Sequence, residues 1–443
     1  MPSIENLPSL AARAAFIAAL IGSGIAQAAT TYEGTPNDYR RLVGKLRPGD
    51  TLALAPGLYR DGLALHNLAG EPDRPITIAG PTGGAPAVFV ANAERNTVSI
   101  LDSHHIVVKN LVLDGSDLPV GAVTAEGHAR YAHHVTIENL LIRRHGNDQG
   151  TVAISTRCPA WNWVIRGNTI IGAGTGMYLG GSTGNAPFIA GVIEHNLIVD
   201  TIGYNLQVKH QHRRPEIDGM PAGASITVIR RNVFSKAAGG STDAARPNVL
   251  VGHFPPEGPG IDDRYVIYGN FFYANASEAL FQGEGNVALY NNLFVNPLGD
   301  AIHIRPHNGI PKNIDIAFNT VVARDAGISV LPGAGSAGYR QAVVGNAVFA
   351  ATPIQGGAQA GNFAAPFAET ARYLARPFAK PGELDLVPRM PLTDPQADAP
   401  NPARLVDWDR DFDRRARKPG SIGAYSSAGA NPAWRPALSL MPD

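Results

Sequence analysis

The chain has 443 residues, of which 44% are hydrophobic and only 17% charged, and its 37 basic side chains equal its 37 acidic ones. This balance excludes the global basic field that holds nucleic acid and the acidic excess that attracts a polycation. Apolar runs throughout the chain, separated by many of its 49 glycines and 35 prolines, exclude a disordered composition. We therefore expect a folded protein with many turns, a long dry interior and no nucleic-acid partner.

Residues 1–28 have the pattern of a secretory signal peptide. Arg13 supplies a positive charge, residues 14–25 form an apolar stretch, and Ala26-Gln27-Ala28 has the small-x-small form of a cleavage site. A core or membrane helix is the alternative interpretation, but the apolar run is short for a span. We expect a periplasmic or secreted protein that is not an integral membrane protein.

A short helix is predicted over residues 37–46. Its apolar residues are Tyr39, Leu42, Val43 and Leu46, which are spaced at helical intervals. We expect this helix to cover the open N-terminal edge of the sheets that follow, because an uncovered strand edge pairs with other chains.

A repeat of two β-prone runs joined by an Asn extends through most of the chain. The repeated residues are Asn110, Asn139, Asn168, Asn196, Asn232, Asn270, Asn292, Asn319 and Asn346. A coil of three short strands and three turns needs about 20–30 residues, and stacked coils pair each strand with one about 4.8 Å away. The repeat therefore predicts an all-β, single-stranded parallel β-helix over residues 29–360.

We interpret the repeated Asn as structural. Asn tolerates the left-handed conformation that a bend requires, and stacked Asn amides form hydrogen-bonded ladders. Residues 361–443 lose the repeat and are rich in Pro, Ala and Asp, so we expect an irregular C-terminal tail that packs on the solenoid.

A third strand follows each Asn-centred pair, and its outward face is the candidate working surface. Period-two alternation places Val152, Ile154, Met177, Leu179, Leu206, Val208, Ile302 and Ile304 inward. The same alternation places outward the candidate substrate-binding residues Tyr178, Asn205, Gln207, Gln211, His303, Arg305 and His307, together with Lys209. A polar, cationic strip of this kind suits an extended anionic glycan.

Lys209 is the first catalytic candidate. It lies immediately before a long insertion over 210–225, close in sequence to the further candidates His210 and Arg213. Abstracting the C5 proton of a uronic acid needs a base, a charge that neutralises the carboxylate, and a proton donor to the leaving oxygen. Lys209 could serve as the base, if its pKa is lowered, or as the partner of the carboxylate.

Three segments resemble a known family. The repeat resembles the right-handed parallel β-helix of the pectate-lyase-like superfamily, and the opening segments 46–59 (LRPGDTLALAPGLY) and 74–78 (RPITI) resemble the first coil of the chondroitinase B and alginate lyase group. The segment 411–425 (DFDRRARKPGSIGAY) is similar to the tail of many exported β-helix proteins. The resemblance implies a right-handed coil and a uronic-acid-containing substrate.

The same resemblance implies a catalytic Lys and an Arg one coil apart, assisted by calcium bound through Asn and Glu side chains. Lys209 corresponds to the Lys by its strand. Gly252 and His253 stand where the Arg is expected, so Arg213 or His253 would have to replace it.

Calcium is the candidate cofactor, and its ligands stay unassigned. Glu216, Asp218 and Glu284 are the acidic candidates, and they form no recognisable site in the sequence. The pairs His104-His105 and His133-His134 are interpreted as turn and core histidines, because neighbours in a strand face opposite sides.

Two functions remain open. The favoured one is a polysaccharide lyase that cleaves a uronic-acid-containing glycan by β-elimination. The alternative is a non-catalytic glycan-binding or cell-surface β-helix protein that uses the same groove. In both, the expected partner is an anionic polysaccharide and the expected state is a monomer.

Overall fold

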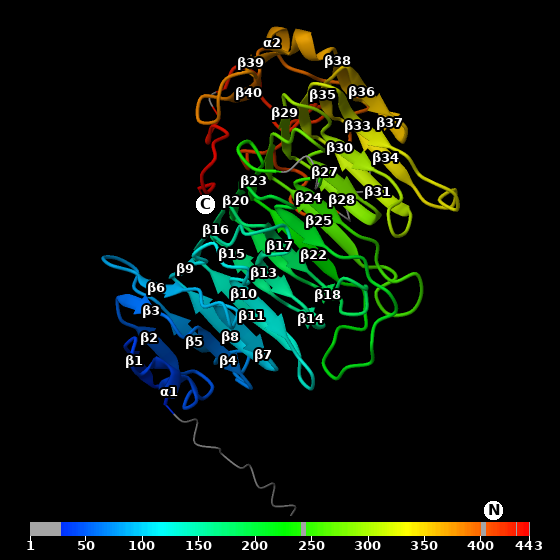
Figure 1. Ribbon diagram of the computed structural model, residues 1–443. Helices are drawn as coiled ribbons and strands as arrows, with labels where there is room; N and C mark the ends of the chain where they lie inside the picture. The colour runs from blue at the N-terminus through cyan, green and yellow to red at the C-terminus, as the bar shows by residue number, and fades with distance from the viewer. Residues whose placement is uncertain (1–27, 241–244, 400–404, 431, 443) are drawn as a thin grey trace, which may run out of the picture.

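The computed structural model describes residues 28–240, 245–399, 405–430 and 432–442. The predicted signal peptide over 1–28 lies outside these residues, apart from its last position. Within the described ranges, three long parallel sheets, named A, B and C, run the length of the molecule. Successive strands of the chain enter the three sheets in turn, so the predicted all-β, right-handed parallel β-helix is confirmed (Figure 1).

The strands of each sheet are given in spatial order. Sheet A contains β1 (Thr31–Gly34), β2 (Thr51–Leu54), β5 (Ile76–Ala79), β8 (Ser103–Lys109), β11 (Ala132–Glu138), β15 (Val164–Arg166), β19 (Val192–Glu194), β22 (Ile226–Arg230), β25 (Arg264–Tyr268), β28 (Gly285–Tyr290), β31 (Pro311–Ala317), β34 (Gln341–Val344) and β37 (Ala358–Ala360), with β14 (Ala160–Trp161) and β18 (Phe188–Ile189) attached beside β11. Sheet B contains β3 (Gly57–Tyr59), β6 (Ala87–Val90), β9 (Leu111–Asp114), β12 (Leu141–Arg143), β16 (Thr169–Ile171), β20 (Leu197–Val199), β23 (Val233–Ser235), β26 (Phe271–Tyr273), β29 (Leu293–Asn296), β32 (Thr320–Ala323), β35 (Ala347–Phe349) and β38 (Phe363–Ala365). Sheet C contains β4 (Leu63–His66), β7 (Val98–Leu101), β10 (Val123–Glu126), β13 (Val152–Thr156), β17 (Thr175–Leu179), β21 (Leu206–Val208), β24 (Val249–Val251), β27 (Phe281–Gly283), β30 (Ile302–Ile304), β33 (Ala326–Val330) and β36 (Thr352–Gln355).

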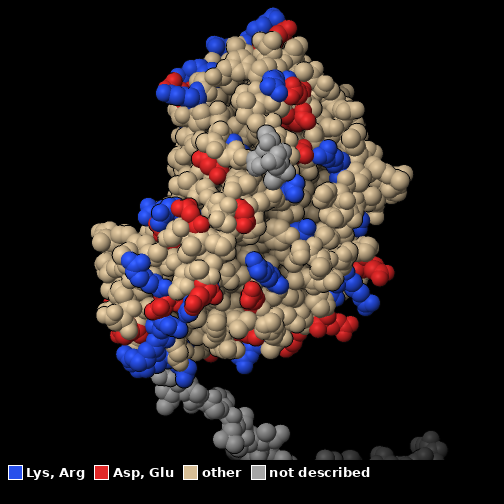
Figure 2. Space-filling model, in the orientation of Figure 1, with Lys and Arg blue, Asp and Glu red and all other residues tan. Residues whose placement is uncertain are grey.

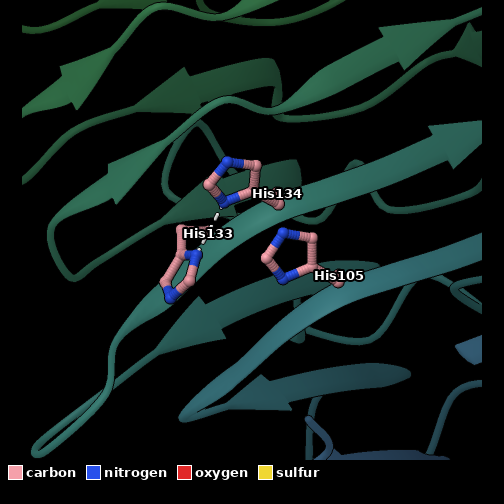
Figure 3. Close-up of side chains that lie close together, drawn as sticks. All are labelled: His105, His133 and His134. Atoms are coloured by element: carbon pink, nitrogen blue, oxygen red, sulfur yellow. Dashed lines mark hydrogen bonds between the residues drawn. The ribbon is translucent and has the colours of Figure 1, made fainter. Parts of the chain in front are cut away.

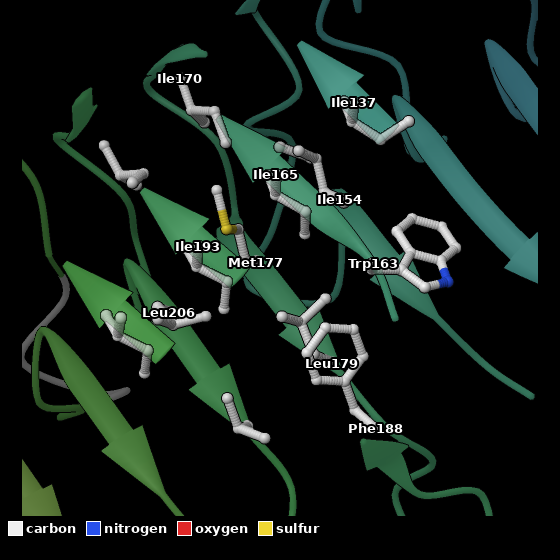
Figure 4. Close-up of a cluster of buried hydrophobic side chains, with 14 of the residues drawn as sticks. Ile137, Ile154, Trp163, Ile165, Ile170, Met177, Leu179, Phe188, Ile193 and Leu206 are labelled. Atoms are coloured by element: carbon white, nitrogen blue, oxygen red, sulfur yellow. The ribbon is translucent and has the colours of Figure 1, made fainter. Parts of the chain in front are cut away.

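The interior is a continuous apolar column between the three sheets. The inward residues expected from period-two alternation in sheet C are all buried, for example Ile154, Met177 and Leu206 at 0% exposure. Figure 4 shows these side chains meeting Ile165 and Ile193 of sheet A. Each fully buried aliphatic side chain contributes about 1.5–3 kcal/mol, so the column is the main source of stability.

Both ends of the chain cover the solenoid. Helix α1 (Tyr39–Val43) packs Tyr39 and Leu42 onto the first coil, and the Tyr39 hydroxyl donates a hydrogen bond to the Gly62 carbonyl at 2.6 Å, which confirms the predicted capping helix. The C-terminal tail contains η2 (Phe367–Glu369), α2 (Thr370–Tyr373) and the hairpin of β39 (Leu374–Arg376) with β40 (Asp385–Pro388). The tail packs Phe412 and other apolar residues against the outer face of sheet B.

None of the helices in the described ranges has the length and hydropathy that a membrane span requires. Figure 2 shows basic and acidic side chains interspersed over the face of Figure 1, as the balanced composition predicts.

The Asn ladder is confirmed for most of its predicted members. From Asn168 onward each Nδ2 donates to the Oδ1 of the Asn in the next coil, at 2.9–3.1 Å. The column consists of Asn168, Asn196, Asn232, Asn270, Asn292, Asn319, Asn346 and Asn362. Hydrogen bonds thus satisfy a row of amides that would otherwise be costly to bury.

Two details of the ladder differ from the expectation. The ladder Asn are not the left-handed residues; the residue before each is, for example Gly167 at φ 65° and His195 at φ 52°. Asn139, at φ 54°, occupies the left-handed position in its coil, and Leu140 takes the ladder position, its N–H donating to Asn168 Oδ1. Asn110, at φ 58°, is likewise left-handed, so neither it nor Asn139 belongs to the ladder.

Candidate active site

Lys209 lies on the outward face of sheet C, in a column kept low by glycines. Strands β17, β21 and β24 pair Leu179 with Val208 and Val208 with Val251. One residue further along each strand, Gly180, Lys209 and Gly252 are therefore aligned. A Cβ at Gly180 would lie 3.2 Å from the Lys209 Cβ, and one at Gly252 would lie 2.3 Å from the His210 backbone nitrogen. Larger residues at either glycine would crowd the lysine.

The Lys209 amine is half-buried beside a tyrosine. Its Nζ lies 5.8 Å from the centre of the Tyr178 ring, within cation–π distance. Among the described residues, no hydrogen bond or ion pair engages this Nζ. Burial lowers the pKa of Lys209, while the nearby Glu284 charge acts in the opposite direction. The amine is therefore easier to deprotonate than an ordinary lysine.

An open cleft of about 790 Å³ borders Tyr178. Its lining includes Arg157 and Tyr178 of neighbouring coils, Tyr204, and residues of the loop 180–186. Arg157 is exposed. The strand pairing aligns it with Gly180 in the next coil and with Lys209 in the coil after that. Arg157 and Tyr204 were not among the predicted site residues, although an alignment of the third strands coil by coil places Arg157 in the Lys209 column.

Three histidines lie next to Lys209. The ring centres of His210 and His253 are 5.5 Å apart, and those of His210 and His212 are 5.2 Å apart. Burial, then the Lys209 charge, lower the pKa of His210 to about 4. His210 is therefore neutral near pH 7, and it supplies no fixed cation to the site.

Three predicted substrate-binding residues are not on the open surface. Asn205 is fully buried and donates to Thr201 Oγ1 and to the Ser235 carbonyl, at 3.0 and 3.1 Å. Gln211 is fully buried and donates to the Phe188 carbonyl, and Gln207 is only 4% exposed. The expectation of an open position is wrong for these three. Asn205 and Gln211 are buried against the carbonyls of other segments, and Gln207 is also buried although alternation turns its side chain outward.

Arg213 lies on the insertion, where its side chain is exposed. It lines a separate hollow of about 370 Å³ with Glu216 and Asp218. Next to it, Arg214 forms a buried ion pair with Asp263, which fixes the insertion to the following coil. Lys209 does not line this hollow, so the structure does not place Arg213 in the role of a second cation beside Lys209.

The strip around β30 is less cationic than expected. His303 Nε2 lies 3.1 Å from Asp300, and Arg305 lies 3.5 Å from Glu278. These two acidic residues were not foreseen, and they offset the charge of the strip. His307 is exposed, and His253 is 8% exposed with its Nδ1 2.8 Å from the Phe254 carbonyl.

The acidic residues near Lys209 do not fit a calcium site. Glu284 is 1% exposed, and its carboxylate accepts backbone N–H groups of His253, His307, Asn308 and Gly309. Its oxygens thus hold the 307–309 turn, while Glu216 and Asp218 lie on the exposed insertion. Calcium prefers several converging carboxylate and carbonyl oxygens, and these three acids do not provide them.

Comparisons with known proteins found similarity at the level of structure. No protein-family model and no curated protein sequence matches the chain. Among solved structures, the alginate lyase from Paenibacillus sp. str. FPU-7 is 16% identical, with 76% of this chain and 96% of that chain covered and a TM-score of 0.39. The PL6 family alginate lyase AlyGC is 16% identical over 79% of this chain and 54% of that chain, with a TM-score of 0.48. A mannuronic acid specific polysaccharide family 6 lyase from human gut microbiota is 15% identical over 77% of this chain and 84% of that chain, with a TM-score of 0.47.

This chain spans about half the length of AlyGC and most of the other two. The parallel registers of sheets A, B and C establish the architecture by themselves. The chain has the right-handed parallel β-helix fold.

Proposed function

We propose that the protein is a polysaccharide lyase that cleaves a uronic-acid-containing glycan by β-elimination, with Lys209 as the base. One observation carries the proposal: a half-buried lysine of lowered pKa, with no partner among the described residues, lies beside a tyrosine that lines an open cleft. A structural lysine would be expected to hold an acceptor or a carboxylate. Fold alone supports no chemistry, whereas this pair places an amine that can lose its proton beside a phenol.

The proposed step assigns one role to each group. Neutral Lys209 takes the C5 proton of the uronic acid, the C4–O bond to the leaving sugar breaks, and a C4–C5 double bond forms. The Tyr178 hydroxyl donates its proton to the leaving oxygen; burial raises the pKa of Tyr178, which keeps that proton in place near pH 7. Arg157, on the wall of the cleft, is the proposed partner of a substrate carboxylate.

The test is the absorbance of the unsaturated uronide product with alginate, pectate, chondroitin, dermatan and glucuronan, with and without calcium. We expect activity on one of these, loss in Lys209→Ala and Lys209→Arg, and retention in Lys380→Ala, which removes an exposed tail lysine. Arginine stays charged, so it cannot act as a base. Full activity in Lys209→Arg would reassign Lys209 to the substrate carboxylate.

A non-catalytic glycan-binding protein is the second candidate, favoured by one observation. Gly252 stands one coil after Lys209, so that coil supplies no second cation to the column. No uronide product from any polysaccharide, together with measurable binding of one of them by calorimetry, would establish this function instead.

We also propose a periplasmic or secreted location. A polymeric glycan is met outside the cytoplasm, and residues 1–28 have the pattern of an export signal. Mass spectrometry of the protein expressed with these residues would show cleavage after Ala28 if the proposal holds, and an intact N-terminus in the cytoplasmic fraction if it fails.

A further inference from the structure

Two pairs of histidines lie one above the other at the start of two neighbouring strands of sheet A. His104 and His105 belong to β8, and His133 and His134 to β11, with His104 paired to His133 in the register. The rings of His104 and His133 stack at 4.8 Å between centres, and those of His105 and His134 at 4.3 Å.

Within each pair the rings face each other instead of pointing to opposite sides. His105 and His134 have φ values of 51° and 52°, outside the β region. Alternation holds only for extended residues, so the expectation that neighbouring histidines diverge is wrong at these positions. The two Nδ1 atoms lie 2.9 Å apart in the first pair and 2.7 Å apart in the second.

Three of these side chains lie close together. Nitrogen atoms of His105, His133 and His134, one from each ring, all lie within 4.8 Å of one another. Figure 3 shows the three rings grouped at the edge of the two strands, with the contact between His133 and His134 marked. We propose that His105, His133 and His134 form a binding site for a divalent transition-metal ion of the zinc, nickel and copper class.

Binding requires the rings to turn, because those of His105 and His134 are stacked at 12° and the metal-binding lone pair of each lies in its own ring plane. Two nitrogens that each lie about 2.0–2.1 Å from a tetrahedral zinc are about 3.3 Å apart. The Nδ1 atoms of His133 and His134 are roughly half an ångström closer than this, and the His105 nitrogen lies within 4.8 Å. Half-buried rings at a strand start can turn and separate, and they remain accessible to an ion from solvent.

The surroundings suit metal ligands. The Trp161 ring stacks on His133 at 4.4 Å and holds its orientation. The Asn162 amide lies 2.9 Å from His134 Nε2. With the amide oxygen facing the ring, Asn162 accepts a hydrogen bond from the Nε2–H, and the Nδ1 of His134 is left to bind the ion.

All-imidazole sites favour zinc, copper and nickel over calcium and magnesium. An ion held by residues of β8 and β11 would join two successive coils. Because it binds the folded chain, it would also raise the unfolding temperature in proportion to its concentration. This site is independent of Lys209 and of the proposed lyase activity.

The test uses the full chain without a histidine tag, stripped of metal with a chelator and titrated with zinc, nickel or copper in a calorimeter. We expect one ion per chain and a rise in unfolding temperature. His105→Gln and His134→Gln should each weaken binding by about 100-fold or more, because even outer-shell changes cost 10–100-fold. His128→Gln, which changes an exposed histidine nearby, should bind as the unmodified protein does.

Two outcomes would overturn the proposal. One is unchanged affinity in His105→Gln and His134→Gln; the other is loss of binding in His212→Gln, which would place the ion at the separate cluster of His210, His212 and His253. Electron paramagnetic resonance of the copper-loaded unmodified protein gives a readout that needs no variant. Three nitrogen ligands are expected, and fewer than three would reject the site.

Discussion

The Nζ of Lys209 lies 5.8 Å from the centre of the Tyr178 ring, and the two residues come from successive coils of sheet C. Parallel stacking places the residues of neighbouring coils about 4.8 Å apart, so an amine and a phenol separated by 31 positions in the chain meet on one surface. Gly180 and Gly252 stand on either side of Lys209 in the column, in the coil before it and the coil after it.

The rate of the proposed lyase reaction should rise with pH. Lys209 must be neutral to act as a base, so the rate is low below its pKa and increases as the proton is lost. Because burial lowers the pKa of Lys209, the increase should be centred below 10.5, the ordinary value for lysine. Initial rates across pH would check this, and a rate that falls throughout the range where lysine deprotonates would contradict the base role.

Glu284→Gln should move that rise to lower pH. The Glu284 charge raises the pKa of Lys209, so removing it makes the amine still easier to deprotonate. The comparison is Glu383→Gln, which removes an exposed carboxylate of the tail and should leave the profile in place. Circular dichroism should accompany both, since the buried Glu284 also holds four backbone N–H groups. A shift toward higher pH in a folded Glu284→Gln protein would refute the assigned coupling.

Gly252→Ala should destabilise the protein and impair the site. The new Cβ would lie 2.3 Å from the His210 backbone nitrogen, so the strand that carries Lys209 must move. Overpacking of this kind costs about 1–3 kcal/mol. Gly83→Ala, where a Cβ meets nothing within 4 Å, is the matched control and should keep the parent stability and activity. Equal denaturant midpoints for the two variants would show that the strand accommodates the methyl group.

Asn270→Ala should lower the free energy of unfolding by about 3 kcal/mol or more. Asn270 accepts hydrogen bonds from the Asn232 backbone and side chain and donates to Ile229 and Asn292, so its loss leaves buried groups unpaired. The control is Asn308→Ala. Asn308 lies in an exposed turn and bonds through its backbone N–H, which alanine retains, so this variant should change the free energy of unfolding by less than about 0.5 kcal/mol. Chemical denaturation of both variants would test this. If Asn270→Ala loses no more stability than Asn308→Ala, the hydrogen bonds of the ladder add no net stability.

The sequence alone predicted the repeat, the three strands of each coil, the capping helix and the Asn ladder from Asn168 onward. Local sequence determines these features, because each coil repeats a similar short run of β-prone residues around an Asn. It also singled out Lys209, since a lysine aligned between glycines is visible once the third strands are aligned. Period-two alternation correctly separated the inward residues of sheet C from the outward ones.

The tertiary structure decided what surrounds each outward side chain. Asn205 and Gln211 face away from the core but are buried against the Ser235 and Phe188 carbonyls, and Glu278 of the preceding coil reaches His303 and Arg305. It also decided where alternation fails: left-handed φ values at His105 and His134 turn neighbouring rings toward one another. Burial and charge pairing depend on contacts between segments that are distant in the chain. Backbone angles at single corner residues depend on how the coils stack. The order of the residues alone therefore does not predict these features.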